Sequence, residues 1–561
     1  MAGLGGGLTI LNSLPSSGVI PFAKPGIERS WLAREMPFDP RLLAGLLVLA
    51  GFVVRLKLAG ATFLNADEAL HFMAANQDSW KLTYRASLTV SHPPLLIFLL
   101  HVWRMFGSSE IILRLPCVAA DTAFGWIFFR WLSDLFGTET GLIGLIFASF
   151  LPPMIAVSAE VRQYAFLLVF AISTMYLLEQ ALAQNSAVKM ACSCLCLWLA
   201  TLSHYSAALL AATLAVYALL RMWKRPPTQA VLQVWLAGEI GELLLGAALY
   251  LTYLSEFGRN ALHGWMGDTY LHNSYFDPQR HHVLLFVLAR SASVFQYVLG
   301  QAVAGDLLFL LFLAGTVAAW RAATIGSIEV PGDQLAALLW LPFLISCGAG
   351  LLDLYPYGGT RHSIFLAIFA ITGISVALVR LVGRHRIWGM AVAVAIVALS
   401  NLFPSHRLPY MARGDQEKSH MDQAMAFVRE RIPRNDLLLA DNQTSLLLGH
   451  YLCQQPFFIN EWTEGLNSLR CAGFRIAATD GRVYTFTAEN FLPSWEQVVR
   501  AYRLNSGDSV WVLQAGWRWE DPLAYELQIR YPQFRDLKIY SFGHNLTIFQ
   551  LKVGQLKISS S

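Results

Sequence analysis

The sequence predicts a polytopic α-helical membrane protein that carries a soluble α/β domain at its C-terminal end. Of its 561 residues, 55% are hydrophobic and only 14% are charged, and the mean hydropathy is +0.46. A typical soluble domain carries about 25% charged residues. Long apolar runs recur as far as residue 403, and the rest of the chain is more polar. These observations place most of the chain in a lipid bilayer.

Eleven stretches are predicted to be membrane-spanning helices, because a span needs about 20 mostly apolar residues. Two more apolar stretches, 93–106 and 283–299, are short and carry Arg or His. We interpret both as helices lying along the membrane interface, the first of them in the first outer loop. The predicted spans are 41–60, 111–133, 139–158, 163–183, 187–203, 205–222, 230–254, 303–320, 335–352, 362–382 and 386–403.

The basic residues indicate the orientation of these spans. With eleven spans, the loops RMWKRPP (221–227) and RLVGRHR (380–386) fall on one side, and the positive-inside rule makes that side cytoplasmic. Residues 1–40 contain no apolar segment with a cleavage site, so we expect a flexible cytoplasmic tail there. The compact loops favour a multi-pass protein of the inner (plasma) membrane.

The part after residue 403 is predicted to be a separate domain outside the cytoplasm, spanning 404–561. Helix-like and strand-like patches alternate in it, which is typical of a small α/β domain. It contains no P-loop, no GxGxxG motif and no GxSxG motif. Cys453 and Cys471 lie in this domain, where they either stay free or form a disulfide.

Composition argues against some partners. The formal net charge is only +4, and no basic tract with interleaved aromatic residues occurs, so nucleic acid is not an expected partner. The seven cysteines do not have the spacing of a zinc site. No metal ligand set or other cofactor is predicted, although a divalent metal is left open.

Two adjacent carboxylates follow the first predicted span, in the stretch TFLNADEALHF (62–72). Asp67 and Glu68 lie just past the outer end of that span, where partial burial raises the pKa of a carboxylate towards the range of a general base. The alternative is that both residues only solvate the first turn of an interfacial helix and interact with its dipole. Both interpretations stay open on these residues alone.

Polar residues at the next two helix ends are further candidates. His92 precedes two prolines that suit the start of a helix, so it would face the same loop from that helix's N-terminus. Arg114 lies about one turn inside the next span, where a charge needs a partner or must reach the interface. Asp121 can share a helical face with Arg114, and we interpret Asp121 as part of a structural ion pair inside the bundle.

The stretch AEVRQY (159–164) indicates a binding site more strongly. It places Glu160, Arg162 and Tyr164, which are an acceptor, a fixed cation and a hydroxyl, at an outer helix junction. An arginine there can hold a phosphate with two hydrogen bonds. A solvated turn is the alternative, but such a turn seldom needs all three groups. His204 and Arg361 mark two further outer junctions, so these groups converge if the spans bundle.

Together these motifs resemble the GT-C superfamily of membrane glycosyltransferases, and more closely the branch that holds protein O-mannosyltransferases and lipid A aminoarabinose transferases. The similarity extends over roughly 41–403, which would be a GT-C-like catalytic domain. The C-terminal domain has no counterpart that we identify. The motifs that carry the resemblance are ADE at 66–68, HPPL at 92–95, RLP at 114–116 and EVRQY at 160–164.

The resemblance implies a donor with a sugar on a polyprenyl phosphate, and an acceptor hydroxyl outside the cytoplasm on a glycolipid, polysaccharide or protein. It also implies inversion at the anomeric carbon and no bound metal. An acidic residue of the first outer loop would activate the acceptor; Asp67 and Glu68 match, and we favour Asp67. Only Lys81 lies near the HPP motif as a possible phosphate ligand, which weakens the expectation of lipid A as the acceptor.

The charges of the remaining candidates suggest their roles. A polyprenyl donor stays in the bilayer, so the reaction takes place at the interface, where Arg162 and Arg361 would stabilise the leaving lipid phosphate. The other predicted contacts of the donor phosphate or the substrate are His92, Arg114, Glu160, Tyr164 and His204.

Two other functions compete with glycosyl transfer. A transporter or flippase of lipid-linked sugars would share the apolar bundle, but it favours charges near the bilayer midplane and internal repeats, and the two halves show no such repeat. A non-catalytic scaffold would bind its partner through the outer domain and would tolerate alanine at the junction residues.

Overall fold

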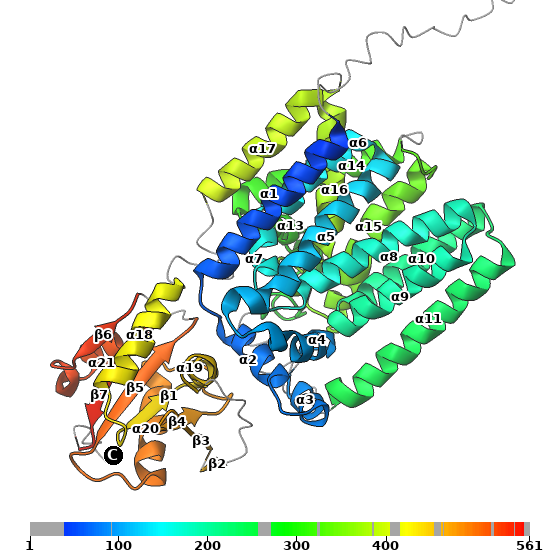
Figure 1. Cartoon of the computed structure of the whole chain (residues 1–561). Helices are drawn as coiled ribbons and strands as arrows, with labels where there is room; N and C mark the ends of the chain where they lie inside the picture. The colour runs from blue at the N-terminus through cyan, green and yellow to red at the C-terminus, as the bar shows by residue number, and fades with distance from the viewer. Residues whose placement is uncertain are drawn as a thin grey trace, which may run out of the picture. The chain divides into compact units, whose positions relative to one another are not determined.

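The chain folds into a bundle of long helices followed by a mixed sheet with helices on both of its faces, as the computed structural model shows (Figure 1). The predicted cytoplasmic tail and the polar joint before the second domain lie outside the described residues, except for residues 39–40 and Phe403. The described residues are 39–90, 92–255, 271–321, 326–383, 386–403, 416–453, 462–463, 465–517, 521–543 and 545–554.

Every predicted span coincides with a helix or a pair of helices. Within the described residues, seven helices are long and apolar enough to cross a membrane by length and composition. They are α1 (Pro40–Ala61), α5 (Glu110–Phe136), α8 (Tyr164–Gln184), α10 (Ala207–Lys224), α11 (Gln229–Leu249) with its continuation η2 (Tyr250–Leu254), α14 (Ala302–Trp320) and α15 (Gly332–Leu351).

The other four predicted spans differ in length or straightness. The stretch 139–158 forms α6 (Thr138–Phe150) and α7 (Pro152–Ser158), which are bent by 62° and count as an eighth span if they cross together. Three more are helices of 17 residues each, at the lower limit for a span. These are α9 (Ala187–Ser203), α16 (Leu366–Val382) and α17 (Arg386–Leu402). The predicted count of eleven therefore exceeds eight by these three helices, and it exceeds seven by one more if α6 and α7 do not cross together.

The two stretches predicted to lie along the interface are also helical. They form α4 (Leu95–Trp103) with η1 (Arg104–Phe106), and α13 (Val283–Leu299). With 17 residues, α13 has the same length as the three short helices above, so length does not distinguish its placement from theirs, and its interfacial position stays a prediction.

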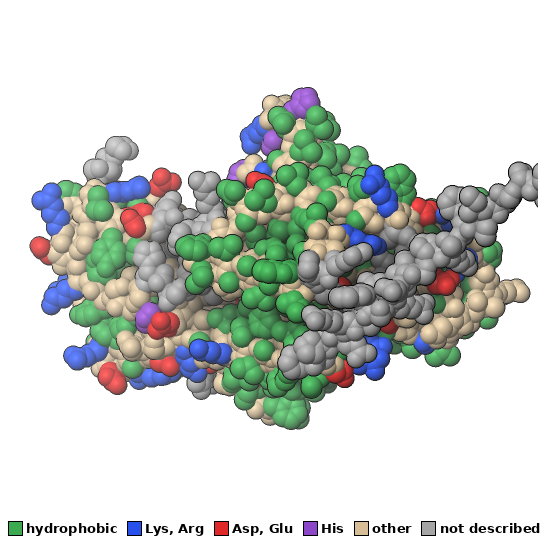
Figure 2. Space-filling view, turned by 90° about the horizontal axis from the view of Figure 1, so that it is seen from above, with side chains coloured by type: hydrophobic (Ala, Val, Ile, Leu, Met, Phe, Trp, Pro, Cys, Tyr) green, Lys and Arg blue, Asp and Glu red, His purple; other side chains and the backbone are tan. Residues whose placement is uncertain are grey.

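The surface of the bundle is apolar, as lipid contact requires. On α1, Leu42, Leu46 and Leu49 are 60%, 55% and 57% exposed, and on α11 Leu243 and Leu244 are 74% and 67% exposed. Such exposure would be unfavourable in water. In the face shown in Figure 2, hydrophobic side chains dominate the middle, whereas Lys, Arg, Asp and Glu gather towards the two ends.

The break between α6 and α7 follows from two prolines and is stabilised by Arg55 of α1. Pro152 and Pro153 have no N–H, so the carbonyls of Ala148 and Ser149 lose their helical partners. The Arg55 guanidinium replaces both, donating to Ala148 O at 2.8 Å and to Ser149 O at 2.7 Å. A buried arginine on the first helix thus makes the bend possible.

The charge of Arg55 is balanced by Asp121 of α5. Arg55 Nε lies 2.5 Å from Asp121 Oδ2, and both side chains are 3% exposed. Asp121 is therefore in a structural ion pair inside the bundle, as we expected. Its partner is Arg55 and not Arg114, because the Arg114 guanidinium is paired with Glu68.

The loop between α1 and α5 forms a layer of short helices at one end of the bundle (Figure 1). These are α2 (Ala66–Ala75), α3 (Trp80–Ser87) and α4. Buried apolar side chains, among them Phe72 of α2 and Ile97 of α4, pack this layer onto Leu113 of α5 and Phe166 of α8. The layer is therefore held in a fixed place over the helix ends.

The C-terminal domain contains a seven-stranded sheet of order β2-β3-β4-β1-β5-β7-β6. The three central strands β4, β1 and β5 are parallel, and the outer pairs are antiparallel. The strands are β1 (Leu437–Ala440), β2 (Trp462–Thr463), β3 (Leu466–Cys471), β4 (Phe474–Thr479), β5 (Ser509–Ala515), β6 (Ile539–Ser541) and β7 (Leu546–Lys552).

Helices cover both faces of this sheet, so the central strands are buried on both sides. In β1, Leu438 and Ala440 pack with α18 (Lys418–Arg431) and α19 (Asn442–Leu448), whereas Leu437 and Leu439 pack with α20 (Ala488–Ala501) and α21 (Leu523–Arg530). The predicted α/β character follows from this alternation. The stretch RVYTF (482–486) has the β-branched and aromatic residues typical of a strand but forms none.

A disulfide joins Cys453 to Cys471. It connects η5 (Gly449–Cys453), which continues α19, to the end of β3. Of the two possibilities left open by the sequence, the structure thus contains the paired form. Disulfides persist in oxidising compartments, which agrees with a domain outside the cytoplasm.

Removing Arg55 should destabilise the helical bundle. Arg55→Met leaves Asp121 buried without its cation and two helix carbonyls without donors, and breaking one partner of a buried pair costs about 3–5 kcal/mol. Thermal unfolding in detergent should show a clear fall in melting temperature. The control is Lys57→Met, on an exposed position of the same helix. Equal melting temperatures for both variants would contradict the structural role of Arg55.

Candidate active site

The helix α2 begins with a capping box that fixes the direction of its first turn. The Asn65 side chain accepts a hydrogen bond from Glu68 N at 3.0 Å, and Asn65 N donates to Glu68 Oε2 at 2.9 Å. Such reciprocal bonds satisfy the free N–H groups of a helix start. Asp67 and Glu68 are thereby held in one turn, with different surroundings.

Glu68 is bonded into the frame of the protein. Arg114 of α5 donates to both of its carboxylate oxygens, each at 2.7 Å, and Val161 N donates to Oε1 at 2.7 Å. Arg114 also donates to the carbonyls of Ala59 and Thr62 at the end of α1, each at 2.8 Å. Both side chains are at most 2% exposed. We therefore propose that Glu68 and Arg114 position the site and do not bind substrate.

Asp67 lies between two arginines that are distant in the sequence. Arg162 Nη1 and Arg361 Nη2 both contact Asp67 Oδ2, at 2.7 Å and 3.0 Å. Arg162 is in the link between α7 and α8, and Arg361 begins η4 (Arg361–Ser363) after α15. Asp67 and Arg361 remain 20% and 19% exposed, whereas Arg162 is 2% exposed, so the cluster is accessible from the side of Asp67 and Arg361, unlike the pair formed by Glu68.

The two arginines determine the protonation state of Asp67. Burial alone would raise the pKa of its carboxyl, but the positive charges of Arg162 and Arg361 outweigh burial and lower that pKa to about 2. The carboxylate is therefore ionised at all ordinary pH values in this state. It is also a weak base as long as both arginines contact it.

Arg162 has bonding capacity to spare. Its Nη2 donates to Tyr164 Oη at 3.3 Å, and its guanidinium lies 5.5 Å from the centre of the Tyr164 ring. Its Nε is buried and has no hydrogen-bond partner among the described residues. Because a buried unpaired N–H is costly, this group is suited to an incoming acceptor such as a phosphate oxygen.

Four histidine rings line the space beside Arg162, and they come from four different segments. The ring centres of His71 and His92 are 5.5 Å apart, those of His92 and His204 are 6.0 Å apart, and those of His204 and His362 are 6.1 Å apart. His92 and His204 were predicted at this site from the sequence. His71 and His362 join them because α2 and η4 bring them there.

These histidines are neutral. Burial, together with the charge of Arg162, lowers the pKa of His71 to about 4 and that of His204 to about 3. Burial likewise holds the pKa values of His92 and His362 well below their ordinary range. The rings therefore act through hydrogen bonds, and the arginines supply the charge.

The hydrogen bonds of two rings identify their tautomers. His71 Nδ1 lies 2.6 Å from the carbonyl oxygen of Asp67, which can only accept, so Nδ1 carries the hydrogen. His71 Nε2 is then an acceptor, and it is buried with no hydrogen-bond donor among the described residues. Ser206 N donates to His204 Nδ1 at 3.2 Å, so the neutral His204 ring carries its hydrogen on Nε2.

Glu160 is the second carboxyl near the arginines. It is partly exposed, and it precedes Arg162 in the same link. Burial and the nearby charge of Glu68 raise its pKa to about 7, against the opposing positive charges of the arginines. Glu160 therefore changes its charge in the physiological range, while Asp67 does not.

The α/β domain reaches this site with residues that sequence reasoning missed. The Arg361 guanidinium lies 5.4 Å from the centre of the Trp517 ring. Burial raises the pKa of the Tyr484 hydroxyl well above its ordinary value, and the negative charge of Asp67 adds to this shift. Both residues follow strands of the sheet, and no motif in the sequence links them to a site more than 100 residues away.

The α/β domain is attached next to this site by polar contacts. Leu64 N donates to Tyr451 Oη at 2.7 Å, and Tyr451 Oη donates to Glu110 Oε1 at 3.0 Å. Lys418 Nζ donates to the other oxygen of Glu110 at 2.8 Å. These bonds attach Leu64, just before α2, and Glu110, the first residue of α5, to the α/β domain.

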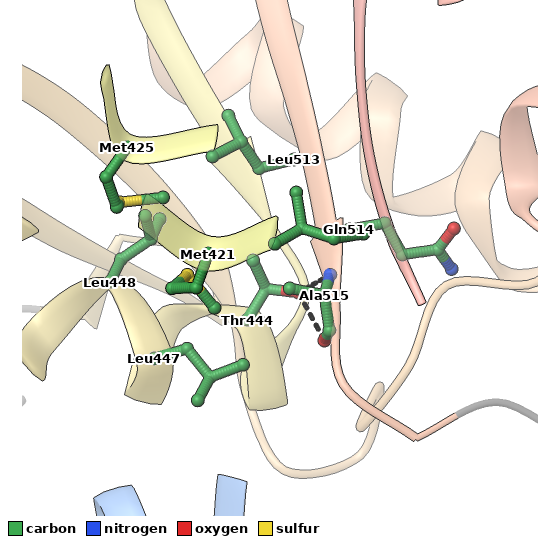
Figure 3. Close-up of a pocket in the computed structure, with 9 residues that line it drawn as sticks. Met421, Met425, Thr444, Leu447, Leu448, Leu513, Gln514 and Ala515 are labelled. Carbon is green, nitrogen blue, oxygen red and sulfur yellow. Dashed lines mark hydrogen bonds between the residues drawn. The ribbon is translucent and has the colours of Figure 1, made fainter. Parts of the chain in front are cut away.

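Two other features offer no alternative site. Among the described residues, no group of three His, Cys, Asp or Glu side chains is arranged to hold a metal ion. A small cavity inside the α/β domain has a free volume of only about 10 Å³, at the lower limit for one water molecule (Figure 3). It is lined mostly by apolar side chains, including Met421, Met425, Leu447, Leu448 and Leu513.

Comparison with known families places a match on the middle of the chain. Residues 91–241 match the family model described as dolichyl-phosphate-mannose-protein mannosyltransferase. That range contains six of the predicted site residues but not Asp67, Glu68 or Arg361. No curated protein sequence matches the chain significantly.

Several solved structures are similar to the chain at low sequence identity. ArnT from Cupriavidus metallidurans bound to undecaprenyl phosphate has 12% identity and a TM-score of 0.51, covering 92% of this chain and 99% of that one. The oligosaccharyltransferase AglB from Archaeoglobus fulgidus has 13% identity and a TM-score of 0.45, and the match covers 84% of this chain and 69% of that one. The Pmt1–Pmt2 protein O-mannosyltransferase complex of S. cerevisiae has 14% identity and a TM-score of 0.31, and the match covers 41% of this chain and 35% of that one.

The similarity to ArnT is one of fold. It covers 92% of this chain and therefore includes both the helical part and the α/β domain. The predicted fold class is confirmed by this likeness, and the predicted resemblance is confirmed by the family match and the shared fold. The C-terminal domain, for which the sequence offered no counterpart, is thus part of an arrangement found in another protein.

The neighbouring acids Asp67 and Glu68 should respond differently to loss of charge. Glu68→Gln leaves the charge of Arg114 buried without a partner, which costs about 3–5 kcal/mol. Asp67→Asn removes the charge of a partly exposed carboxylate, and although Arg162 is buried, the second arginine, Arg361, is partly exposed, so a smaller loss is expected. Thermal unfolding of both purified variants checks this order. Asp67→Asn melting at the lower temperature would contradict the positioning role proposed for Glu68.

Proposed function

We propose that this chain is a glycosyltransferase of the GT-C type, which its family match over residues 91–241 and its fold support, and that it transfers a sugar from a polyprenyl-phosphate donor to an acceptor hydroxyl outside the cytoplasm. The observation that carries the proposal is the accessible cluster in which Arg162 and Arg361 converge on one oxygen of Asp67. The cluster combines cations for a phosphate with a carboxylate for a hydroxyl proton, at the ends of apolar helices.

The donor phosphate is proposed to bind between Arg162 and Arg361. Two guanidinium groups offer paired N–H donors that fit phosphate oxygens. The buried Nε of Arg162 adds a donor that no described residue uses. The lipid-bound state of ArnT in its solved structure agrees with a lipid phosphate as ligand, although it concerns that protein. The apolar surface of the bundle keeps a polyprenyl chain in the bilayer while its phosphate reaches the arginines.

Donor binding would itself activate the base. Asp67 has a low pKa because it contacts both arginines. A phosphate that takes over part of these contacts weakens the hold of the positive charges, so the pKa of Asp67 rises towards a useful range. Asp67 would therefore become an effective base only when a donor is present.

The bond changes follow from this arrangement. The acceptor oxygen attacks the anomeric carbon, and the bond from that carbon to the phosphate oxygen breaks. The electron pair leaves with the lipid phosphate, and the hydroxyl proton passes to Asp67. A single displacement of this kind inverts the anomeric carbon. Arg162 and Arg361 stabilise the charge on the leaving phosphate, a contribution of about 3 kcal/mol for each donor lost in comparable sites.

The acceptor is proposed to be a glycolipid, polysaccharide or protein hydroxyl. The site faces the α/β domain, which contains a disulfide, and this supports a location outside the cytoplasm for both. We propose an inner (plasma) membrane location with a cytoplasmic N-terminus, on the basis of the basic loops.

Replacing Asp67 or Arg162 should abolish transfer. The assay supplies purified protein with a radiolabelled polyprenyl-phosphate sugar and, as acceptor source, membranes from cells that lack the protein. Asp67→Ala should lower turnover by about 10²–10⁴-fold, as expected for loss of a general base. Arg162→Ala should lower it by about 10²–10³-fold. The control is Arg85→Ala, an exposed cation of α3.

The same assay distinguishes the competing functions. A transporter would leave the label on the lipid, and a scaffold would give no turnover that depends on Asp67 or Arg162. Full turnover of Asp67→Ala, with normal folding, would remove Asp67 as the base.

Donor affinity should fall as the pH rises through about 7. Glu160 is mostly neutral below its pKa of about 7 and negative above it, where its charge opposes an anionic donor near Arg162 and Arg361. A sugar phosphodiester donor keeps a constant charge in this range, so the change reports on the protein. We expect about a tenfold weaker affinity at pH 9 than at pH 5, and no such change in Glu160→Gln. A pH-independent affinity in the wild type would contradict this.

A further inference from the structure

The edge of the sheet at which the parallel strands end is turned towards the candidate active site. Strands β4, β1 and β5 run in the same direction, so their ends at Thr479, Ala440 and Ala515 lie at one edge. The order reverses at β1, since the chain places β4 on one side of it and β5 on the other. Open α/β sheets bind ligands at this edge, beside such a reversal.

One buried residue at this edge holds two aromatic residues. Gln443, at the start of α19, is fully buried. Its side-chain amide makes two hydrogen bonds to the backbone of Trp517: Nε2 donates to Trp517 O at 2.9 Å, and Oε1 accepts from Trp517 N at 3.0 Å. The backbone N of Gln443 donates to Tyr484 O at 3.1 Å. The loops after β4 and β5 are therefore fixed with respect to each other.

The turn before Trp517 can be made only by glycine without strain. Gly516 has φ of +110°, a conformation that other residues rarely adopt. A Cβ at this position would also lie 2.5 Å from Gln443 Oε1. The approach of the two segments is thus built into the backbone, and Trp517 is presented from a rigid support.

Both aromatic residues lie beside the groups assigned to the reaction. Trp517 is partly exposed, and its ring centre is 5.4 Å from the Arg361 guanidinium, which in turn contacts Asp67. Tyr484 is also partly exposed, and it is close enough to Asp67 to be influenced by its charge. The α/β domain therefore presents aromatic surface next to the arginine that would hold the donor phosphate.

We propose that Trp517 and Tyr484 form a subsite for the sugar ring of the donor, with Gln443 as the residue that positions both. This inference rests on the proposed function. A phosphate held at Arg361 has the lipid chain on its bilayer side, so the sugar must extend towards the α/β domain. A pyranose ring has an apolar face of C–H groups and an edge of hydroxyls, which match an aromatic ring and a phenolic hydroxyl.

The subsite is tested by equilibrium binding of two kinds of lipid in detergent, one with a sugar and one without, in the absence of acceptor. One probe is polyprenyl-phosphate mannose, because the matched family description names mannose, with the glucose and aminoarabinose forms beside it. The other is polyprenyl methyl phosphate, which keeps the phosphodiester charge but has no sugar. The wild-type protein is compared with Trp517→Ala, with Trp517→Phe as the conservative variant and with Tyr525→Ala as the control on an exposed aromatic residue of α21.

The wild type should bind at least one sugar lipid about tenfold more tightly than the methyl ester, as about 1.4 kcal/mol corresponds to tenfold. Trp517→Ala should lose most of this gain while its affinity for the methyl ester changes less than about twofold, and Trp517→Phe and Tyr525→Ala should keep it. Equal weakening of both lipids in Trp517→Ala would show that Trp517 only supports Arg361. If Trp517→Ala binds the donor normally but has a higher KM for the acceptor in the transfer assay, the subsite belongs to the acceptor. Either result overturns the inference.

Failure of the proposed function gives a different result. The methyl ester should bind the wild type, and Arg162→Ala should weaken its binding by tenfold or more. If the methyl ester does not bind, or if Arg162→Ala binds it normally, the phosphate site is wrong. If it binds as expected but sugars add no affinity that depends on Trp517, only the subsite is wrong.

Discussion

The cost of burying a guanidinium group organises this protein. A charged side chain removed from water must be paired and hydrogen-bonded. Arg55 meets this requirement with Asp121 and the free carbonyls of α6, and Arg114 meets it with Glu68 and the end of α1. Arg162 meets it only in part, because its Nε has no partner among the described residues. Arg55 and Arg114 join helices. Arg162, in the link between α7 and α8, keeps beside Asp67 and Arg361 a hydrogen-bond donor that no described residue uses.

The division of labour between Asp67 and Glu68 follows from their partners. Adjacent residues in one helical turn point in different directions, so one carboxylate is taken up by Arg114 and the other faces Arg162 and Arg361. The neutral histidines contribute donors and acceptors without adding charge. The electrostatics of the cluster therefore depend on two arginines and two carboxyls, Asp67 and Glu160, of which only Glu160 titrates near neutral pH.

Local patterns in the sequence were sufficient for the helices and for much of the cluster. Apolar runs located every span, because lipid imposes a length and composition on each of them. The EVRQY stretch pointed to Arg162 because three polar groups at a helix junction have little structural reason to occur together. The partner of Asp121 could not be predicted, since it depends on which helix packs against α5. Trp517, Tyr484 and Gln443 could not be predicted either, because their position depends on how the sheet domain meets α2 and η4.

The contacts between Asp67, Arg361 and Trp517 span 450 positions of the chain. During synthesis, Asp67 is available early, Arg361 follows after most of the helices have been inserted, and Trp517 emerges near the end. Trp517 reaches its place beside Arg361 only when the sheet has folded, and the disulfide between Cys453 and Cys471 forms in the same domain. A chain that lacks the last domain therefore has Asp67 and Arg361 without Trp517, and the assembled centre appears only once that domain has folded.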